Sequence, residues 1–138
     1  MFSIAIVLEL SGFPQFSRGS GNYIIFYYIN LIQPAGARFW VLDRRFPKVV
    51  LILTLGSAGA LGREPGEAAF FVPAVKVTAV DTTGAGDTFA GYVAAALDAG
   101  ERLEPAMRRA AKASAISVTR EGAAPSIPTL AEVEAVDA

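Results

Sequence analysis

Histidine and cysteine are both absent from the 138 residues of this chain. Their absence excludes Ser-His-Asp and Cys-His catalytic arrangements, the usual zinc sites and disulfide bonds. Any acid–base chemistry therefore depends on carboxylates, lysines or tyrosines. The lack of cysteine is compatible with a reducing cytoplasm, which is the compartment that we expect for this protein.

Charge of one sign is not in excess either. The chain has 12 Lys and Arg against 13 Asp and Glu, and no basic stripe is visible, so nothing favours nucleic acid as a partner. The aromatic run Tyr23–Ile29 is too short to span a bilayer as a helix. The apolar start Met1–Leu8 follows no basic region, which argues against a signal peptide. We therefore expect no membrane partner.

The composition changes near Phe46 and Pro47. Before this point charges are sparse and aromatic residues dense, whereas alanine, glycine and alternating charges dominate after it. Residues 1–47 have two interpretations: a buried strand with flanking loops, or a segment that is not native to the rest of the chain. A truncated gene, a shifted reading frame or a misplaced start codon would produce such a join. The sequence thus predicts two parts, an atypical segment over 1–47 and a domain over 48–138.

From Lys48 onward the pattern predicts strands followed by helices, which indicates α/β architecture. The apolar run Val49–Leu55 is typical of a strand buried on both faces, and Gly56–Gly59 ends it. Thr129–Glu132 fits a capping box that begins a short last helix. The other expected elements are strands at Ala68–Val72 and Val75–Val80, a helix over Asp87–Asp98 stopped by Gly100, a helix from Glu104 to Val118 with Pro105 in its first turn, and a loop over Glu121–Pro128.

The run Asp81-Thr82-Thr83-Gly84-Ala85-Gly86-Asp87-Thr88-Phe89 is the most informative stretch of the chain. Its glycines let backbone N–H groups approach an anion, and the start of a helix adds a favourable dipole. Asp87 then stands where it can take a proton from an attacking hydroxyl. The run is neither a Walker A loop, since no Gly-Lys-Ser/Thr comes after the glycines, nor a dinucleotide fingerprint, since Phe89 replaces the third glycine. A plain glycine-rich turn is the alternative.

Three segments resemble the ribokinase-like carbohydrate kinases, the PfkB family. Asp81–Phe89 is similar to the C-terminal signature of that family, Thr54–Gly59 to its nucleotide loop, and Val118–Pro128 to its closing segment, most of all in ribokinases. Read alone, Thr54–Gly59 would be a tight turn and Val118–Pro128 a Gly/Pro loop. The resemblance covers residues 48–136 and implies the C-terminal part of a three-layer α/β/α ribokinase-like fold.

The resemblance implies ATP-dependent phosphorylation of a sugar hydroxyl, with Mg²⁺ and K⁺ as ions. The backbone of Gly84, Ala85, Gly86 and Asp87 would form an anion hole, and Asp87 would be the base. The implied ATP contacts are Thr54, Leu55, Gly56, Ser57, Ala58, Gly59, Gly86, Asp87 and Ala111. The implied cation positions are Asp81, Thr83, Ser117, Arg120, Gly122 and Ser126. Asp81 fits a strand-end turn equally well, and Ala111 stands where relatives often carry Asn or His against the adenine.

The lid and the N-terminal half of the family are not recognisable. The chain has no Gly-Gly pair, and neither Asn22 nor Asn30 begins the family's Asn-x-x-Glu motif, because Ile25 and Gln33 stand where glutamate is needed. We expect either a truncated sugar kinase or a non-catalytic nucleotide-binding fragment, with fructose or a nucleoside as alternatives to ribose. An uncovered strand edge and apolar face would favour homo-oligomers.

Overall fold

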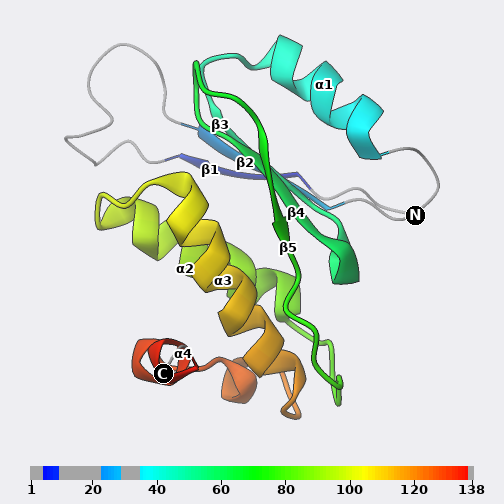
Figure 1. The fold of residues 1–138 in the computed structure, drawn as a ribbon, viewed down its shortest axis with the longest axis vertical. Coiled ribbons are helices and arrows are strands. Elements are labelled where there is room, and N and C mark those ends of the chain that lie inside the picture. The colour runs from blue at the N-terminus through cyan, green and yellow to red at the C-terminus, as the bar shows by residue number, and fades with distance from the viewer. Residues whose placement is uncertain (1–4, 10–22, 29–34, 137–138) are drawn as a thin grey trace. The chain divides into compact units, whose positions relative to one another are not determined.

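The computed structural model describes residues 5–9, 23–28 and 35–136 of the chain. The backbone separates into two compact units, Met1–Phe71 and Val72–Ala138, with the boundary inside strand β5 (Phe70–Pro73). Figure 1 shows strands and one α-helix in the first unit, and three α-helices with an extended segment before them in the second.

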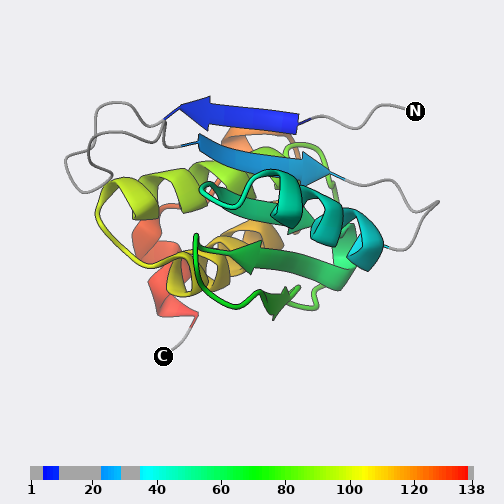
Figure 2. The same cartoon turned by 90° about the horizontal axis from the view of Figure 1, so that it is seen from above.

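The first unit is built on a sheet with the strand order β1-β2-β3-β4-β5. Its other strands are β1 (Ala5–Glu9), β2 (Tyr23–Tyr28), β3 (Val50–Thr54) and β4 (Gly59–Arg63). β1 runs antiparallel to β2, β2 parallel to β3, and β3 antiparallel to β4. Parallel neighbours need a crossover connection, and helix α1 (Ala35–Arg45) supplies it between β2 and β3. Figure 2 shows α1 lying over one face of this sheet.

The core of the first unit forms between α1 and β3. Phe39 of α1 packs with Val49, Leu51 and Leu53, and all four are buried. On the other face of β3, Ile52 is fully buried as well. The prediction of a central strand buried on both faces is therefore confirmed.

A buried arginine joins β4 to the segment that links α1 and β3. The guanidinium of Arg63, only 4% exposed, donates to the carboxylate of Asp43. It also donates to the carbonyl oxygens of Phe46, Pro47 and Val49, at 3.1, 3.2 and 3.0 Å. These bonds give the charge the partners that burial requires. Residues on both sides of position 47 thus contact β3 and β4. The division of the chain into a segment over 1–47 and a domain over 48–138 stays a prediction.

The second unit is a helical hairpin with a short third helix. α2 (Ala85–Asp98) and α3 (Leu103–Val118) lie side by side along most of their length (Figure 1). Gly100, at a φ of 86°, ends α2, and Pro105 lies in the first turn of α3, both as predicted. α4 (Leu130–Ala135) begins with the predicted capping box, because Glu132 N–H donates to Thr129 Oγ1 and the Glu132 carboxylate accepts from Thr129 N–H.

Several predicted strand boundaries need correction. Val75–Val80 is not a strand: its backbone forms no ladder, and Val75, Val77 and Val80 are exposed. Alternating valines predict an extended conformation, but a strand also needs a neighbour to pair with. The strand expected at Ala68–Val72 lies at Phe70–Pro73.

Three elements of the first unit were not predicted, namely β1, α1 and β4. The strand that one interpretation expects within residues 1–47 is β2. Of the two apolar runs noted in the sequence there, Ile29 and Met1–Ile4 lie outside the described residues. Among the helices in the described ranges, none has the length and apolarity that crossing a membrane requires.

Candidate active site

The glycine-rich run forms a tight turn that leads directly into α2. Gly84 is the N-cap residue and has a left-handed conformation, with φ 76° and ψ 5°. Thr88 N–H donates to Gly84 O at 2.9 Å, which is the first hydrogen bond of the helix. Ala85, Gly86 and Asp87 therefore occupy the first helical turn. Ala85 N–H donates to Thr82 O at 3.3 Å, and the N–H groups of the next two residues point toward the N-terminal end of the helix. This is the geometry that suits an anion.

Gly84 is required here for two reasons. Its positive φ is a conformation that other residues adopt only at a cost. A Cβ atom at this position would also lie 3.2 Å from Cβ and 3.3 Å from Cα of Ala123. The loop after α3 thus lies directly against the turn before α2.

Asp81 ties the turn to that loop. Its Oδ1 accepts from Thr83 N–H at 2.9 Å, and its Oδ2 accepts from Gly122 N–H at 3.0 Å. Hydrogen bonds from Thr83, and then the one from Gly122, lower the pKa of Asp81 below its ordinary value. The structure thus places Asp81 in a turn role, while its role as a cation ligand remains a proposal.

Asp87 is the third residue of α2, and its side chain is exposed. A negative charge in the first helical turn interacts favourably with the helix dipole. The next residue, Thr88, is 3% exposed, and its hydroxyl has no hydrogen-bond partner among the described residues. The Asp87 carboxylate is therefore accessible at the start of α2, whereas Thr88 is buried.

Five of the six predicted cation positions fall on the turn and on the loop after α3, and Ser117 lies in the last turn of α3. Asp81, Thr83 and Gly122 are brought together by the hydrogen bonds of Asp81. Ser126, fully buried, donates its hydroxyl to Ala123 O at 2.6 Å. Ser117, 1% exposed, donates its hydroxyl to Ser114 O at 2.8 Å.

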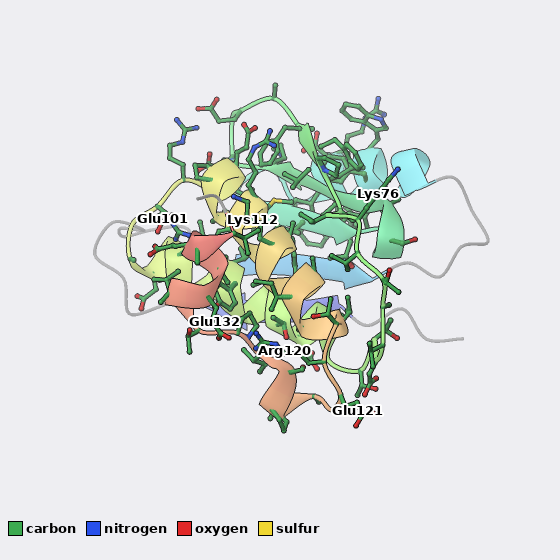
Figure 3. All side chains as sticks on the ribbon, turned by 60° about the horizontal axis from the view of Figure 1, so that its bottom comes forward. Lys76, Glu101, Lys112, Arg120, Glu121 and Glu132 are labelled. Atoms are coloured by element: carbon green, nitrogen blue, oxygen red, sulfur yellow. The ribbon has the colours of Figure 1, made fainter. Side chains whose placement is uncertain are left out.

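The Arg120 side chain bonds to α4 and not to the turn. Its guanidinium pairs with Glu132 of α4 at 2.7 Å, and Figure 3 shows the two side chains approaching each other. The side chain therefore anchors the loop, and the role of Arg120 as a cation ligand, through its backbone oxygen, stays a prediction. Within residues 5–9, 23–28 and 35–136, no group of three or more Asp or Glu could hold a metal ion.

The predicted nucleotide loop lies in the first unit, as the connection between β3 and β4. Gly56–Ala58 forms a single 3₁₀ turn, and Leu55 N–H donates to Gly59 O at 2.8 Å. Gly56 has a φ of 57°, which favours glycine there. Ala111 lies on α3 in the second unit and is buried.

One contact to the turn was not anticipated from the sequence. Ser114 of α3 donates its hydroxyl to Ala85 O, in the first turn of α2, at 3.0 Å. The only local signal was a pair of serines, Ser114 and Ser117, in an alanine-rich helix. Such a signal does not reveal the partner, because the two ends of this bond are 29 residues apart.

A hollow of about 430 Å³ runs along α2 from Asp87 to Ala99. Its walls are mostly apolar or small, and Ile127 and Leu130 contribute to them. Tyr92 lies in it and donates its hydroxyl to Pro128 O at 2.6 Å. Burial, and then the charge of Glu132, raise the pKa of Tyr92 above its ordinary value.

Comparison with known proteins matches this chain to one family, over a range that includes the candidate site residues. The model described as "pfkB family carbohydrate kinase" matches residues 41–130. Ribokinase from Schizosaccharomyces pombe is 49% identical over 84 residues, which are 61% of this chain and 26% of that protein.

Solved structures agree with this match. Ribokinase from Cryptococcus neoformans var. grubii in complex with ADP is 44% identical, with a TM-score of 0.61 over 64% of this chain and 28% of that one. A ribokinase II from E. coli in complex with ATP and Mg²⁺ is 34% identical, with a TM-score of 0.59 over 62% and 28%. The matched part of the chain thus spans 26–28% of the length of these proteins.

Proposed function

Because the chain belongs to the pfkB family of carbohydrate kinases, we propose that it carries the phosphoryl-transfer part of an ATP-dependent kinase acting on a sugar hydroxyl. Its described fold is the C-terminal part of a ribokinase-like α/β fold. The observation that carries the proposal is the turn at Gly84, which presents the start of α2 beside an exposed carboxylate. Ribose is the proposed acceptor, since the S. pombe and C. neoformans proteins are ribokinases.

The backbone of Gly84–Asp87 is proposed to stabilise the transferring phosphoryl group. N–H groups at a helix start point at an anion without having to reorganise, and one such preorganised donor is worth about 3–4 kcal/mol in other enzymes. Gly84 sets the turn, and the loop after α3 holds it, because Ala123 lies against Gly84 and Gly122 N–H donates to Asp81. The donors are therefore fixed before the substrate arrives.

Asp87 is proposed as the general base. It would take the proton of the sugar hydroxyl as that oxygen attacks the γ-phosphorus in line. An ordinary carboxylate is a weak base, but a loose phosphoryl transition state needs positioning more than basicity. The exposed position of Asp87 at the helix start supports this role.

ATP is the proposed phosphoryl donor, and Mg²⁺ its companion ion. The C. neoformans and E. coli proteins were solved with ADP and with ATP and Mg²⁺, respectively. Thr54–Gly59 and Ala111 are the proposed nucleotide contacts. The part of the chain that the structure describes has no acidic cluster for a metal, and Mg²⁺ is commonly bound through substrate phosphates, where it neutralises their charge.

A K⁺ site is proposed at Asp81, Thr83, Ser117, Arg120, Gly122 and Ser126. The oxygen atoms of this set suit a hard monovalent ion, and the backbone of the turn and loop supplies most of them. Each Asp81 carboxylate oxygen accepts one backbone N–H and keeps lone-pair capacity for a cation.

A second candidate function is a nucleotide-binding module that performs no catalysis alone. It is favoured by the share of the relatives that the chain spans, 26–28%. A coupled assay with ribose, ATP, Mg²⁺ and K⁺ separates the two candidates, with fructose and a nucleoside tested in parallel. Ribose-dependent ADP release supports the kinase. ATP binding by calorimetry without ADP release supports the module, and the absence of both contradicts both proposals.

A further inference from the structure

The hydroxyl of Ser114 joins the last third of α3 to the first residue of α2. It donates to the carbonyl oxygen of Ala85 at 3.0 Å, and Ser114 itself is half-buried. In a helix this carbonyl also accepts a bond from the residue four positions later. The bond from Ser114 is therefore additional to those that the helix makes for itself.

The carbonyl of Ala85 and the N–H of Gly86 belong to one peptide unit. Because that unit is planar and trans, fixing the direction of the carbonyl also fixes the direction of the N–H, which points the opposite way. The Ser114 hydroxyl thus sets the orientation of a group that the proposed function assigns to the anion hole. A hydrogen bond to the carbonyl also polarises the amide and strengthens its N–H as a donor.

This peptide unit gains support from outside the helix. Helix ends fray, and Gly86 has no side chain with which to hold its own backbone. The turn before it is held from the other side, where Gly84 packs against Ala123 and Asp81 bonds Gly122 N–H. Ser114 supplies the restraint from α3.

We propose that Ser114 is a positioning residue that orients the Gly86 N–H of the anion-binding turn through the Ala85 carbonyl. The inference rests on the proposed function, because it takes the turn to be the phosphate site. It adds a residue of α3 that acts through the Ala85 carbonyl and not by its own bond to the phosphate. It also makes the α2–α3 contact a determinant of phosphate affinity.

The test is a titration of the ¹⁵N-labelled full chain with inorganic phosphate, followed through the amide resonances of residues 84–87. We compare the wild type with Ser114→Ala, Ser114→Thr and Thr119→Ala. Thr119 is the matched control, because its hydroxyl bonds Ile116 O within α3 and reaches no other helix. Amide hydrogen exchange of Gly86 without phosphate is measured on the same samples.

We expect Ser114→Ala to weaken phosphate binding about fivefold, the effect of one lost hydrogen bond, and to speed exchange at Gly86. Ser114→Thr keeps the hydroxyl and restores both, and Thr119→Ala resembles the wild type. Equal affinity and exchange in Ser114→Ala and the wild type overturn the inference and leave the proposed function standing. If phosphate shifts no turn amide in the wild type, the anion hole fails and the inference fails with it.

Discussion

Asp81 Oδ2 accepts a hydrogen bond from the N–H of Gly122 at 3.0 Å, although 41 residues separate the two. The bond closes the loop after α3 onto the turn before α2. Through it, the two segments most similar to the kinase family become one structural element. The conformation of the turn therefore depends on the loop, and a substitution in either segment should alter the conformation of both.

Replacing Asp81 with Asn should loosen this element, because the amide can accept only one of the two N–H groups. The pKa of Asp81 is lowered in the folded state, so its stabilisation is present above the ordinary pKa and is lost as pH falls through the lowered value. We expect a lower unfolding temperature than wild type at pH 7 and a smaller difference at pH 3. Glu121→Gln, an exposed change beside Gly122, is the control (Figure 3). A constant difference across this range would contradict the carboxylate's role.

Glu132 should give α4 a distinct sensitivity to acid. Bonds from Thr129 N–H, the Arg120 side chain and the Thr129 hydroxyl lower the pKa of Glu132 to about 2. Its stabilisation is complete above its ordinary pKa and is lost as pH falls to about 2. Glu132→Gln should flatten the unfolding temperature between pH 5 and pH 2 by circular dichroism. Glu134→Gln, on the same helix but outside the capping box, should keep the wild-type slope.

The two glycines Gly84 and Gly91 should respond in opposite directions to alanine. Gly84→Ala meets both a left-handed φ and Ala123, and we expect a loss of about 1–2 kcal/mol in the free energy of unfolding. Gly91 lies inside α2 with no atom within 4 Å of a built Cβ, so Gly91→Ala should gain up to about 1 kcal/mol. Denaturant unfolding checks both. Losses of equal size would show that helix packing, not the turn, decides the effect.

Arg63 should be the most sensitive charged residue of the first unit. Arg63→Met removes the guanidinium donor from the buried side of Asp43 and from three carbonyl oxygens, and we expect a loss of about 2–3 kcal/mol. Arg44→Met, an exposed change in the last turn of α1, should stay within about 0.5 kcal/mol. A wild-type unfolding midpoint for Arg63→Met would show that residues 43–49 do not depend on β4.

Local sequence patterns predicted the elements whose signals are complete within a few residues. The apolar run that became β3, the helix stop at Gly100 and the capping box of Thr129 and Glu132 are of this kind. β4 was missed because Gly59–Arg63 has no β-branched residue, and its pairing with β3 gives it its strand form.

The contacts that shape the candidate site were not predictable in this way. The bonds from Ser114 to Ala85 and from Gly122 to Asp81 join residues 29 and 41 positions apart, and no periodicity marks them. The sequence did predict the residues of the turn itself, because a glycine pair before an acidic residue has a local physical meaning. Whether those residues bind phosphate and ATP stays a prediction.

The central claim is that Asp87 and the turn before it transfer a phosphoryl group. The most direct measurement compares the wild type with Asp87→Asn in ribose-dependent ADP release, with ATP affinity determined on the same samples. The account predicts that Asp87→Asn binds ATP as the wild type does and releases no ADP, because only the base is lost. Release of ADP by Asp87→Asn at the wild-type rate would contradict it.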